Sequence, residues 1–334
     1  MSTETLSLSD IRALAQNALR TAGATEENAA PLADAVAAAE EDGISSHGLA
    51  YIPVYCLHLR CGKVNGKAAP RVSRDKPTAI MVDADHGFAH PAIAAGMELL
   101  QPAASDNGIA AMGIRQSYNC GVLGYHTEKI AAAGFVGIGF TNAPASIAPV
   151  GGIRPVLGTN PFSVAAPTAG APFVIDQSAS VIAKSEIAKR ARAGQNIPDH
   201  WALDAEGKPT TDAQAALLGS MLPSGGYKGI GVALLVEMMA AMLPAANLGI
   251  WASPFAGDQG GPPATGQFFI AINPDAFGGG AEFSKRLSAL CDAITSQDAR
   301  LQGQKRQAAR QQAAQNGVAV EAKLLATVRE LGGV

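Results

Sequence analysis

His47 is the residue in this sequence best suited to proton transfer. It lies in the motif Ser-Ser-His-Gly, where Gly48 would let a ligand approach the backbone closely. A neutral imidazole donates or accepts a proton near physiological pH. A lone histidine is more often a structural or surface residue, and that alternative stays open on the motif alone.

Asp176 is the best candidate for a carboxylate partner of His47. It ends the apolar run Phe-Val-Ile, so it would leave a buried strand, and burying an unpaired charge is costly. We therefore expect Asp176 to pair with His47, orient the imidazole ring and stabilise the imidazolium.

Two further segments have the composition of ligand-binding sites. Residues 116–126 (QSYNCGVLGYH) are polar and aromatic around two glycines, which fits a ligand pocket or the entry to a helix. Lys228 precedes an apolar helix, where its positive charge is unfavourable unless an anionic ligand binds there. A surface lysine explains Lys228 equally well. The histidines interpreted as surface residues are His58, His86 and His200.

The common nucleotide motifs and metal-binding motifs are missing from the sequence. No Gly-x-Gly-x-x-Gly follows the strand candidate at residues 80–82, and residues 226–231 have glycines at the wrong spacing and lack the Ser/Thr of a phosphate loop. These gaps exclude a standard Rossmann fold and a nucleoside triphosphatase. The four cysteines match no zinc motif, so no metal is expected, and no basic neighbour in the sequence would activate Cys120.

Composition limits the class of protein and its partners. The chain has 334 residues, 48% hydrophobic and 16% charged, enough for one large domain or two lobes with extensive buried surface, and a homo-oligomer fits the low charge. A net charge of −3 with 5% aromatic residues gives no basis for binding nucleic acid.

The N-terminus lacks a signal-peptide pattern, and few cysteines favour a cytoplasmic protein. The most apolar helix candidate, residues 229–243, contains Glu237 and is too short to span a membrane, so we expect a buried core helix.

A Gly/Pro-rich stretch at residues 140–180 lies at the centre of the predicted fold. It is apolar and has only two charges, Arg154 and Asp176, so we expect it to be buried and to hold a ligand with its backbone. Around it the sequence predicts helical ends and a mixed α/β centre. Ser9 would cap a helix to Thr21, and Thr25 a helix at residues 26–41. Further strands are expected at 78–82, 109–114, 134–141 and 268–272, and helices at 91–101, 124–133, 179–193, 281–295 and 320–331.

Five motifs, in their order along the chain, resemble one known family. They are Ser46-His47-Gly48, Gly158-Thr159-Asn160-Pro161, Asp176 after its strand, Pro209-Thr210-Thr211-Asp212 and Gly225-Gly226-Tyr227-Lys228-Gly229. The chain resembles the type-2 malate/L-lactate dehydrogenase family, which includes sulfolactate and ureidoglycolate dehydrogenases and piperideine-2-carboxylate/pyrroline-2-carboxylate reductases. The resemblance covers nearly the whole chain.

The resemblance implies an α/β (mixed α+β) non-Rossmann fold that binds NADP or NAD, with a slight preference for NADPH. It implies a helical lobe of residues 1–75, completed by about 180–218 and 285–334, packed on an α/β lobe of residues 76–179 and about 219–284. It also implies a homodimer and a small carboxylate substrate. The expected reaction is hydride transfer between the nicotinamide and a 2-oxo/2-hydroxy acid; the alternative is reduction of a cyclic imino acid.

The resemblance also implies which residues form the site. By this resemblance Ser46, His47 and Asp176 form a proton relay, with His47 as the general acid in reduction, and Lys228 binds substrate. The segments that match cofactor-binding stretches are Asn119, Cys120 and Gly121; Thr141, Asn142 and Pro144; Thr159 and Asn160; Gln177 and Ser178; and Lys184 and Ser185.

Two positions near the expected substrate depart from the family pattern. Tyr51 stands where many members have arginine, and Tyr118-Asn119 stands where many have two histidines. We assign Tyr51 and Tyr118 to substrate binding, and these departures leave the identity of the substrate open.

Overall fold

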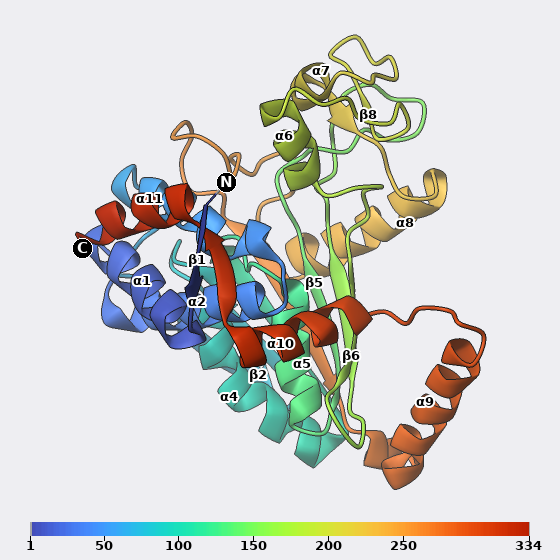
Figure 1. Cartoon of the computed structure of the whole chain (residues 1–334). Helices are drawn as coiled ribbons and strands as arrows, with labels where there is room; N and C mark the ends of the chain where they lie inside the picture. Colours follow the sequence, from blue (N-terminus) through green and yellow to red (C-terminus); the bar gives the residue numbers. More distant parts are fainter. Residues whose placement is uncertain (1, 334) are drawn as a thin grey trace.

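The computed structural model describes residues 2–333, in which helices from both chain ends pack beside a seven-stranded sheet (Figure 1). The N-terminal helices are α1 (Leu8–Thr21), α2 (Glu26–Glu41) and α3 (Ile52–Arg60), and α11 (Ala322–Gly332) packs against α1 and α3. The first strand, β1 (Thr3–Leu6), pairs antiparallel with β11 (Val318–Glu321). One hydrophobic cluster runs through these helices, from Ile11 to Val328.

The large sheet has the strand order β2-β3-β4-β10-β5-β6-β7, and only the β3–β4 pair is parallel. Its strands are β2 (Arg71–Lys76), β3 (Ala79–Asp83), β4 (Ile109–Ser117), β5 (Val136–Thr141), β6 (Phe162–Ala166), β7 (Phe173–Gln177) and β10 (Thr265–Ile272). Helix α4 (Ala89–Asn107) packs on β3 and β4, and α5 (Leu123–Ala132) packs on β5 and β6. The mixed α/β fold expected from the sequence is confirmed.

Another hydrophobic cluster lies above one end of the sheet (Figure 1). It joins α6 (Lys184–Arg192), the β8–β9 pair (Ala202–Leu203, Ser220–Met221) and α7 (Ala213–Leu218) to Ile147 and Leu157. Residues 180–218 therefore pack in a hydrophobic cluster that is separate from the cluster of α1, α2 and α11. The boundaries of the two lobes stay a prediction.

Most helices and strands predicted from apolar periodicity are present, with shifted ends. The predicted helix at residues 91–101 extends over Ala89–Asn107, and the strand predicted at 109–114 continues to Ser117. The cap prediction for α1 is wrong by two residues. Ser7, not Ser9, is the N-cap, because its hydroxyl accepts from the Asp10 amide at 3.1 Å and the Asp10 carboxylate accepts from the Ser7 amide.

The stretch at residues 140–180 is only partly buried, so the expectation that the whole stretch is buried is wrong. Its second half forms β6 and β7, but the loop between β5 and β6 exposes Val150 (63%) and Ile153 (51%). The parts that flank this loop are buried, Asn142 and Asn160 among them. Backbone held against a ligand is therefore expected at the two ends of the loop.

The apolar helix at residues 229–243 is not a buried core helix. It forms α8 (Tyr227–Val236) and a π-helical segment, η3 (Glu237–Met242), which packs on β10 and β5. Its outer side exposes five large apolar residues: Leu234, Leu235, Met238, Met242 and Leu243. Across residues 2–333, no helix combines the length and the apolar character needed to cross a membrane.

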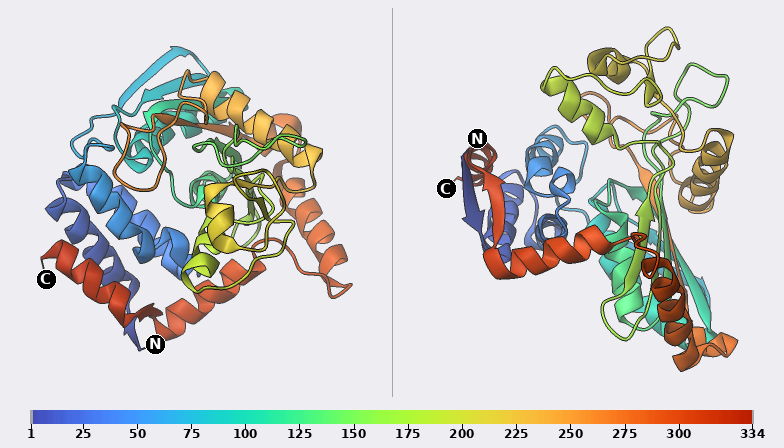
Figure 2. Two further views of the ribbon diagram at one scale, coloured as in Figure 1. Left: turned by 90° about the horizontal axis from the view of Figure 1, so that it is seen from above. Right: turned by 45° about the vertical axis from the view of Figure 1, so that its right-hand side comes forward.

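Helix α10 (Gln304–Asn316) joins the two ends of the fold. The short 3-10 helix η4 (Pro274–Phe277) is followed by α9 (Gly280–Thr295). The chain then returns past the sheet, and α10 runs from α5 toward α2 (Figure 2). Arg306 and Arg310 of α10 both pair with Asp42 at the end of α2 and Glu128 of α5. These ion pairs connect the C-terminal part of the chain both to the N-terminal helices and to the helix that packs on β5 and β6.

Candidate active site

His47 lies in a pair of 3-10 turns between α2 and α3, namely η1 (Ser45–His47) and η2 (Leu49–Tyr51). No regular helix begins at Ser45 or Ser46, and α3 starts at Ile52 with Pro53 in its first turn. A Cβ at Gly48 would lie 2.1 Å from Glu40 Oε1, which accepts from the Leu49 amide at 2.7 Å. The close approach that Gly48 permits is therefore made by Glu40 and not by a ligand.

The His47 ring is partly buried and neutral near physiological pH. Its Nδ1 pairs with Ser46 Oγ at 3.1 Å. Burial is the cause that lowers the pKa of His47 below its usual 6.5. A ring in this state accepts a proton at one nitrogen while the serine hydroxyl fixes the other, as the predicted Ser46–His47 pair requires.

Asp176 lies near the end of β7, and its carboxylate accepts a hydrogen bond from the backbone amide of Gly124. Gly124, in the first turn of α5, donates to Asp176 Oδ2 at 2.7 Å. Burial raises the pKa of Asp176, while the Gly124 amide and Arg306 act in the opposite direction. Within residues 2–333 no hydrogen bond or ion pair joins Asp176 to His47, so the expected direct pairing is absent from this structure. The Gly124 amide, in the first turn of α5, takes the place of His47 as the hydrogen-bond partner of the Asp176 carboxylate.

Residues 118–121 connect the His47 side of the site to the Asp176 side. The Tyr51 ring stacks parallel to His47, with ring centroids 6.4 Å apart, and the Asn119 side chain lies near the Tyr51 hydroxyl. Cys120 is buried between Thr141 and Asp176, and burial raises the pKa of its thiol to about 12. Asn119 thus lies beside the His47–Tyr51 pair, and its sequence neighbour Cys120 lies near Asp176.

Tyr118 lies behind Tyr51 rather than beside it. Its side chain is 1% exposed and its hydroxyl hydrogen-bonds His58 Nδ1. His58 is itself fully buried on α3 and donates from Nε2 to the Gly257 carbonyl at 2.8 Å. The expectation that His58 is a surface residue is wrong, because it lies on the inner face of α3, against Tyr118.

Glu237 links two of the predicted cofactor segments. Asn142 follows β5, Asn160 precedes β6, and both donate to the Glu237 carboxylate, at 3.4 Å and 3.1 Å. Gly249 donates to the same carboxylate at 3.4 Å. The signal that could have revealed this role was a single carboxylate inside an otherwise apolar helix. Glu237 therefore holds both ends of the Gly/Pro-rich loop.

Several buried polar atoms at this end of the sheet have no hydrogen-bond partner within residues 2–333. They are Ser117 Oγ at the end of β4, and Thr265 Oγ1 and Gln267 Oε1 of β10. Thr265 is the register partner of Ser117, and Gln267 is the register partner of Thr141. Unpaired buried polar atoms are rare in folded proteins. Their position beside the segments of Tyr118 and Thr141 fits the binding of a polar cofactor.

The other predicted site residues lie on separate elements. Thr159 accepts from the Ala179 amide with its backbone carbonyl, and Ser178 Oγ pairs with Ser180 Oγ. Lys228 is exposed near the start of α8, on the opposite side of the central strands from α1 and α2 (Figures 1 and 2). The structure does not bring Lys228 to His47 within one chain. The remaining predicted residues lie after β5 (Pro144), at the end of β7 (Gln177), at the start of α6 (Lys184, Ser185) and before α5 (Gly121).

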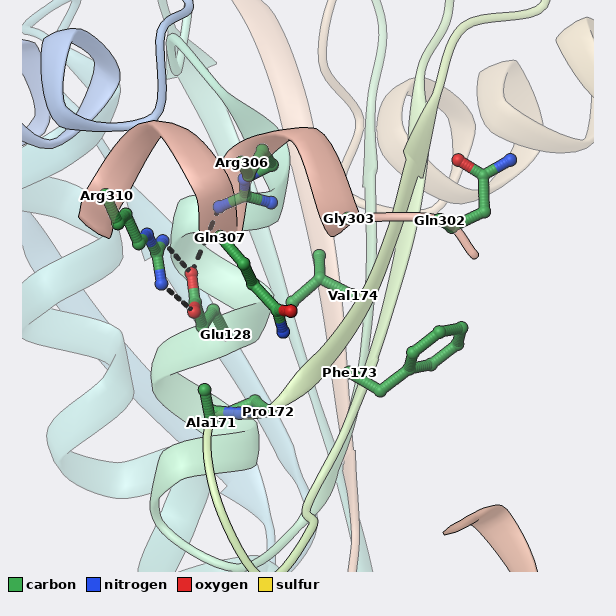
Figure 3. A pocket seen from close by; sticks show the side chains of 10 residues that line it. All are labelled: Glu128, Ala171, Pro172, Phe173, Val174, Gln302, Gly303, Arg306, Gln307 and Arg310. Carbon is green, nitrogen blue, oxygen red and sulfur yellow. Dashed lines mark hydrogen bonds and ion pairs between the residues drawn. The ribbon is translucent and has the colours of Figure 1, made fainter. Parts of the chain in front are cut away.

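A small surface cleft lies between β7 and α10 (Figure 3). Arg306, Arg310 and Glu128 line it, and Figure 3 shows both arginines directed at the Glu128 carboxylate. A Cβ at Gly124 would lie 2.9 Å from both Arg306 Nη1 and Asp176 Oδ2. Arg306 is thus the cation beside Asp176. The polar tail gave no sequence signal for this role.

The fold packs helices beside a mixed sheet, and the candidate site combines a neutral histidine with loops that present backbone and side-chain amide groups. This combination is typical of a non-Rossmann nicotinamide oxidoreductase. Residues 6–329 match the family model described as malate/L-lactate dehydrogenase. The chain belongs to this family and is an oxidoreductase. The resemblance inferred from the five motifs is confirmed.

Characterised relatives of two kinds are similar to the chain over nearly its whole length. The (2R)-3-sulfolactate dehydrogenase (NADP(+)) of Chromohalobacter salexigens is 41% identical over 92% of each chain. The Delta(1)-pyrroline-2-carboxylate reductase of Ancylobacter novellus is 38% identical over 98% of this chain and 97% of the relative. The crystal structure of delta1-piperideine-2-carboxylate reductase from Pseudomonas syringae has a TM-score of 0.94 and 34% identity, covering 98% of this chain and 100% of that chain.

Proposed function

We propose that this enzyme transfers a hydride between NADPH or NADH and a small 2-oxo/2-hydroxy acid. The observation that carries the proposal is the partly buried, neutral His47, held by Ser46 beside Tyr51. The 41% identity to an NADP(+)-dependent sulfolactate dehydrogenase supports both the reaction class and a slight preference for NADPH.

The alternative reaction is reduction of a cyclic imino acid, such as pyrroline-2-carboxylate or piperideine-2-carboxylate. Relatives named for these activities match the chain over most of its length. A specific observation also favours this alternative. Tyr51, next to His47, presents a phenol and not a cation, and a ring substrate with one carboxylate needs fewer cations than a diacid.

In either reaction His47 moves the proton. In reduction His47, once protonated, donates to the oxygen or nitrogen of the forming alcohol or amine, and in oxidation it accepts that proton. Ser46 fixes the Nδ1 side of the ring. Asp176 would stabilise the site after a movement that releases it from the Gly124 amide, or through groups between it and His47. The nicotinamide cofactor, when bound, supplies or accepts the hydride.

The residues proposed to hold the cofactor follow or precede strands at the end of the sheet where Ser117 and Gln267 lie, apart from the two at the start of α6. Asn119, Cys120 and Gly121 follow β4, and Thr141, Asn142 and Pro144 follow β5. Thr159 and Asn160 precede β6, while Gln177 and Ser178 end β7 and Lys184 and Ser185 begin α6. The unpaired polar atoms at this end give the segments polar chemistry suited to a dinucleotide. Lys228 would bind substrate only if a partner subunit brought it to the site.

A screen that follows the absorbance of the reduced nicotinamide tests the proposed function. NADPH and NADH are each combined with pyruvate, oxaloacetate, sulfopyruvate, pyrroline-2-carboxylate and piperideine-2-carboxylate. We expect turnover with at least one substrate, faster with NADPH than with NADH. Failure of every pair, with protein shown to be folded, would contradict the proposal.

We further propose that the enzyme is a cytoplasmic homodimer. The exposed apolar side of α8 and η3 supports a dimer, since Leu235, Met238 and Leu243 are 43%, 48% and 61% exposed. All four cysteines are free thiols, which suits a reducing compartment. A Met238→Glu substitution should convert a dimer to monomers in light scattering coupled to gel filtration. An unchanged mass, or a wild-type monomer, would contradict this assignment.

A further inference from the structure

Residues 252–261, which we call the strap, link the sheet to the helical lobe. The strap precedes β10, and its orange ribbon reaches over to the blue N-terminal helices in Figure 1 and in the left view of Figure 2. Lys63, fully buried after α3, donates from Nζ to the Pro254 carbonyl at 2.6 Å and to the Gln259 carbonyl at 2.8 Å. His58 donates to Gly257 of the same segment.

These contacts fix the strap although its tip is exposed. Burying a lysine without hydrogen bonds is costly, so the two carbonyls that accept from Lys63 offset the desolvation of its ammonium group. The charge of Lys63 is thereby directed at the strap backbone. Three hydrogen bonds from buried side chains hold one short irregular segment, which indicates a built feature rather than a loosely packed loop.

The strap places Phe255 against Tyr118 and Tyr51 of the candidate site. The Phe255 ring meets the Tyr118 ring edge-on, with centroids 5.2 Å apart. Its carbonyl accepts from the Tyr51 hydroxyl at 3.4 Å, and Tyr51 stacks on His47. Tyr118 is fully buried, while Phe255 and Tyr51 are partly exposed. Phe255 and Tyr51 are therefore the accessible members of the aromatic cluster that reaches His47, and we call these two residues the aromatic wall.

This wall carries no ionised group. Tyr51 has a pKa raised by burial to about 12, so its phenol is neutral, and its other polar contact is the neutral Asn119. Tyr55, Phe88 and Tyr118 continue the aromatic cluster behind it. A second carboxylate or a sulfonate would lose its hydration against such a wall without gaining a cation, whereas an apolar group would gain contact.

We propose that Phe255, fixed by the strap, is a specificity-determining residue that selects substrates whose group beside the reacting carbon is apolar. The proposal rests on the proposed reaction and narrows its substrate class. A 2-oxo acid with an aliphatic or aromatic side chain, or a cyclic imine with ring methylenes, meets this requirement. Oxaloacetate and sulfopyruvate, which carry a second anion, do not.

The test uses two 2-oxo acids of nearly the same shape but different charge. In 4-methyl-2-oxopentanoate two methyl groups stand where oxaloacetate has two carboxylate oxygens. We expect kcat/KM of the wild-type enzyme to be at least about tenfold higher for 4-methyl-2-oxopentanoate. Phe255→Ala should reduce that preference by at least about fivefold, whereas Phe277→Ala, at an exposed and remote phenylalanine, should leave it unchanged.

Phe255→Leu serves as a second variant if alanine unfolds the strap, and it should retain most of the preference. Equal or better turnover of oxaloacetate by the wild type would overturn the proposal, as would a Phe255→Ala variant that slows both substrates by the same factor.

Calorimetric titration of the NADPH-loaded protein distinguishes a failure of the proposed specificity from a failure of the proposed reaction. The probes are malate and 2-hydroxy-4-methylpentanoate. Tighter binding of the apolar acid by at least about tenfold supports the role of Phe255 even where neither 2-oxo acid is reduced. Equal binding, or tighter binding of malate, overturns it.

Discussion

The environment that tunes the His47 ring is burial, together with one contact to Ser46, and no charged group within residues 2–333 pairs with the ring. Ser46 and His47 are neighbours in sequence, so their contact could be expected from the motif alone. The bond from Gly124 to Asp176 could not, because it joins residues 52 positions apart. Glu237 was visible only as one charge in an apolar helix, and its bonds to Asn142 and Asn160 depend on tertiary packing.

The lowered pKa of His47 predicts the pH dependence of both reaction directions. Reduction requires the protonated ring, so its kcat/KM should fall as pH rises through a pKa below 6.5. Oxidation requires the neutral ring, so its kcat/KM should rise through the same pKa. Nicotinamide absorbance measured across the acid and neutral range gives both profiles. A break above the usual histidine pKa in both directions would contradict the assignment.

Replacing Glu237 by alanine should weaken both stability and cofactor binding. The Asn142 and Asn160 amides would lose a buried acceptor, which costs about 1–3 kcal/mol of unfolding free energy. Urea unfolding with an unchanged m-value measures this loss, and fluorescence titration with NADPH measures the binding. Glu98→Ala, on the exposed side of α4, should change stability by less than about 0.5 kcal/mol. A Glu237 variant that behaves like the Glu98 variant would remove Glu237 from this role.

At the scale of elements, apolar periodicity predicted the helices and strands that bury a face. Helix α10 has the sequence QKRQAARQQAAQN, with no apolar stripe, and it is held by ion pairs that only the folded chain forms. The exposed strand β1 exists because β11, at the other end of the chain, pairs with it. Neither element carries a local signal.

Arg310→Ala should loosen α10 and destabilise the protein. Asp42, whose side chain is 2% exposed, accepts from Arg310 Nε at 2.5 Å, and Glu128 accepts at 2.6 Å. Losing charge-assisted bonds to a buried carboxylate should cost about 2 kcal/mol, seen by urea unfolding and by faster hydrogen exchange in α10. Lys285→Ala, which breaks an exposed pair with Glu282, should cost at most about 0.5 kcal/mol. Equal effects of the two variants would argue against α10 as a tether.

At the scale of the whole molecule, buried histidines set the acid limit of stability. His126 is 3% exposed beneath residues 118–121, packs against His90, and donates to the Cys120 carbonyl at 2.9 Å. Burial lowers the pKa of His126 to about 4 and that of His90 well below 6.5. Between these values and 6.5 the unfolded chain binds more protons, so stability falls as pH falls.

His126→Gln should make stability less dependent on pH. For the wild type, acidification from about pH 7 to about pH 4 should remove on the order of 3 kcal/mol through His126 alone. The variant retains a donor for Cys120 and should lose that much less over the same interval. Urea unfolding at the two pH values gives the difference. His200→Gln, at an exposed histidine, is the matched control, and a His126 variant with the wild-type pH slope would contradict this explanation.

The most direct test of the central claim compares wild type with His47→Ala in the reduction of the best substrate from the screen. We predict that kcat/KM falls at least about 100-fold, while the Kd for NADPH changes less than about twofold, because the ring moves a proton and does not hold the cofactor. His200→Ala should match wild type in both measurements. Turnover by His47→Ala within about threefold of wild type would show that another group moves the proton.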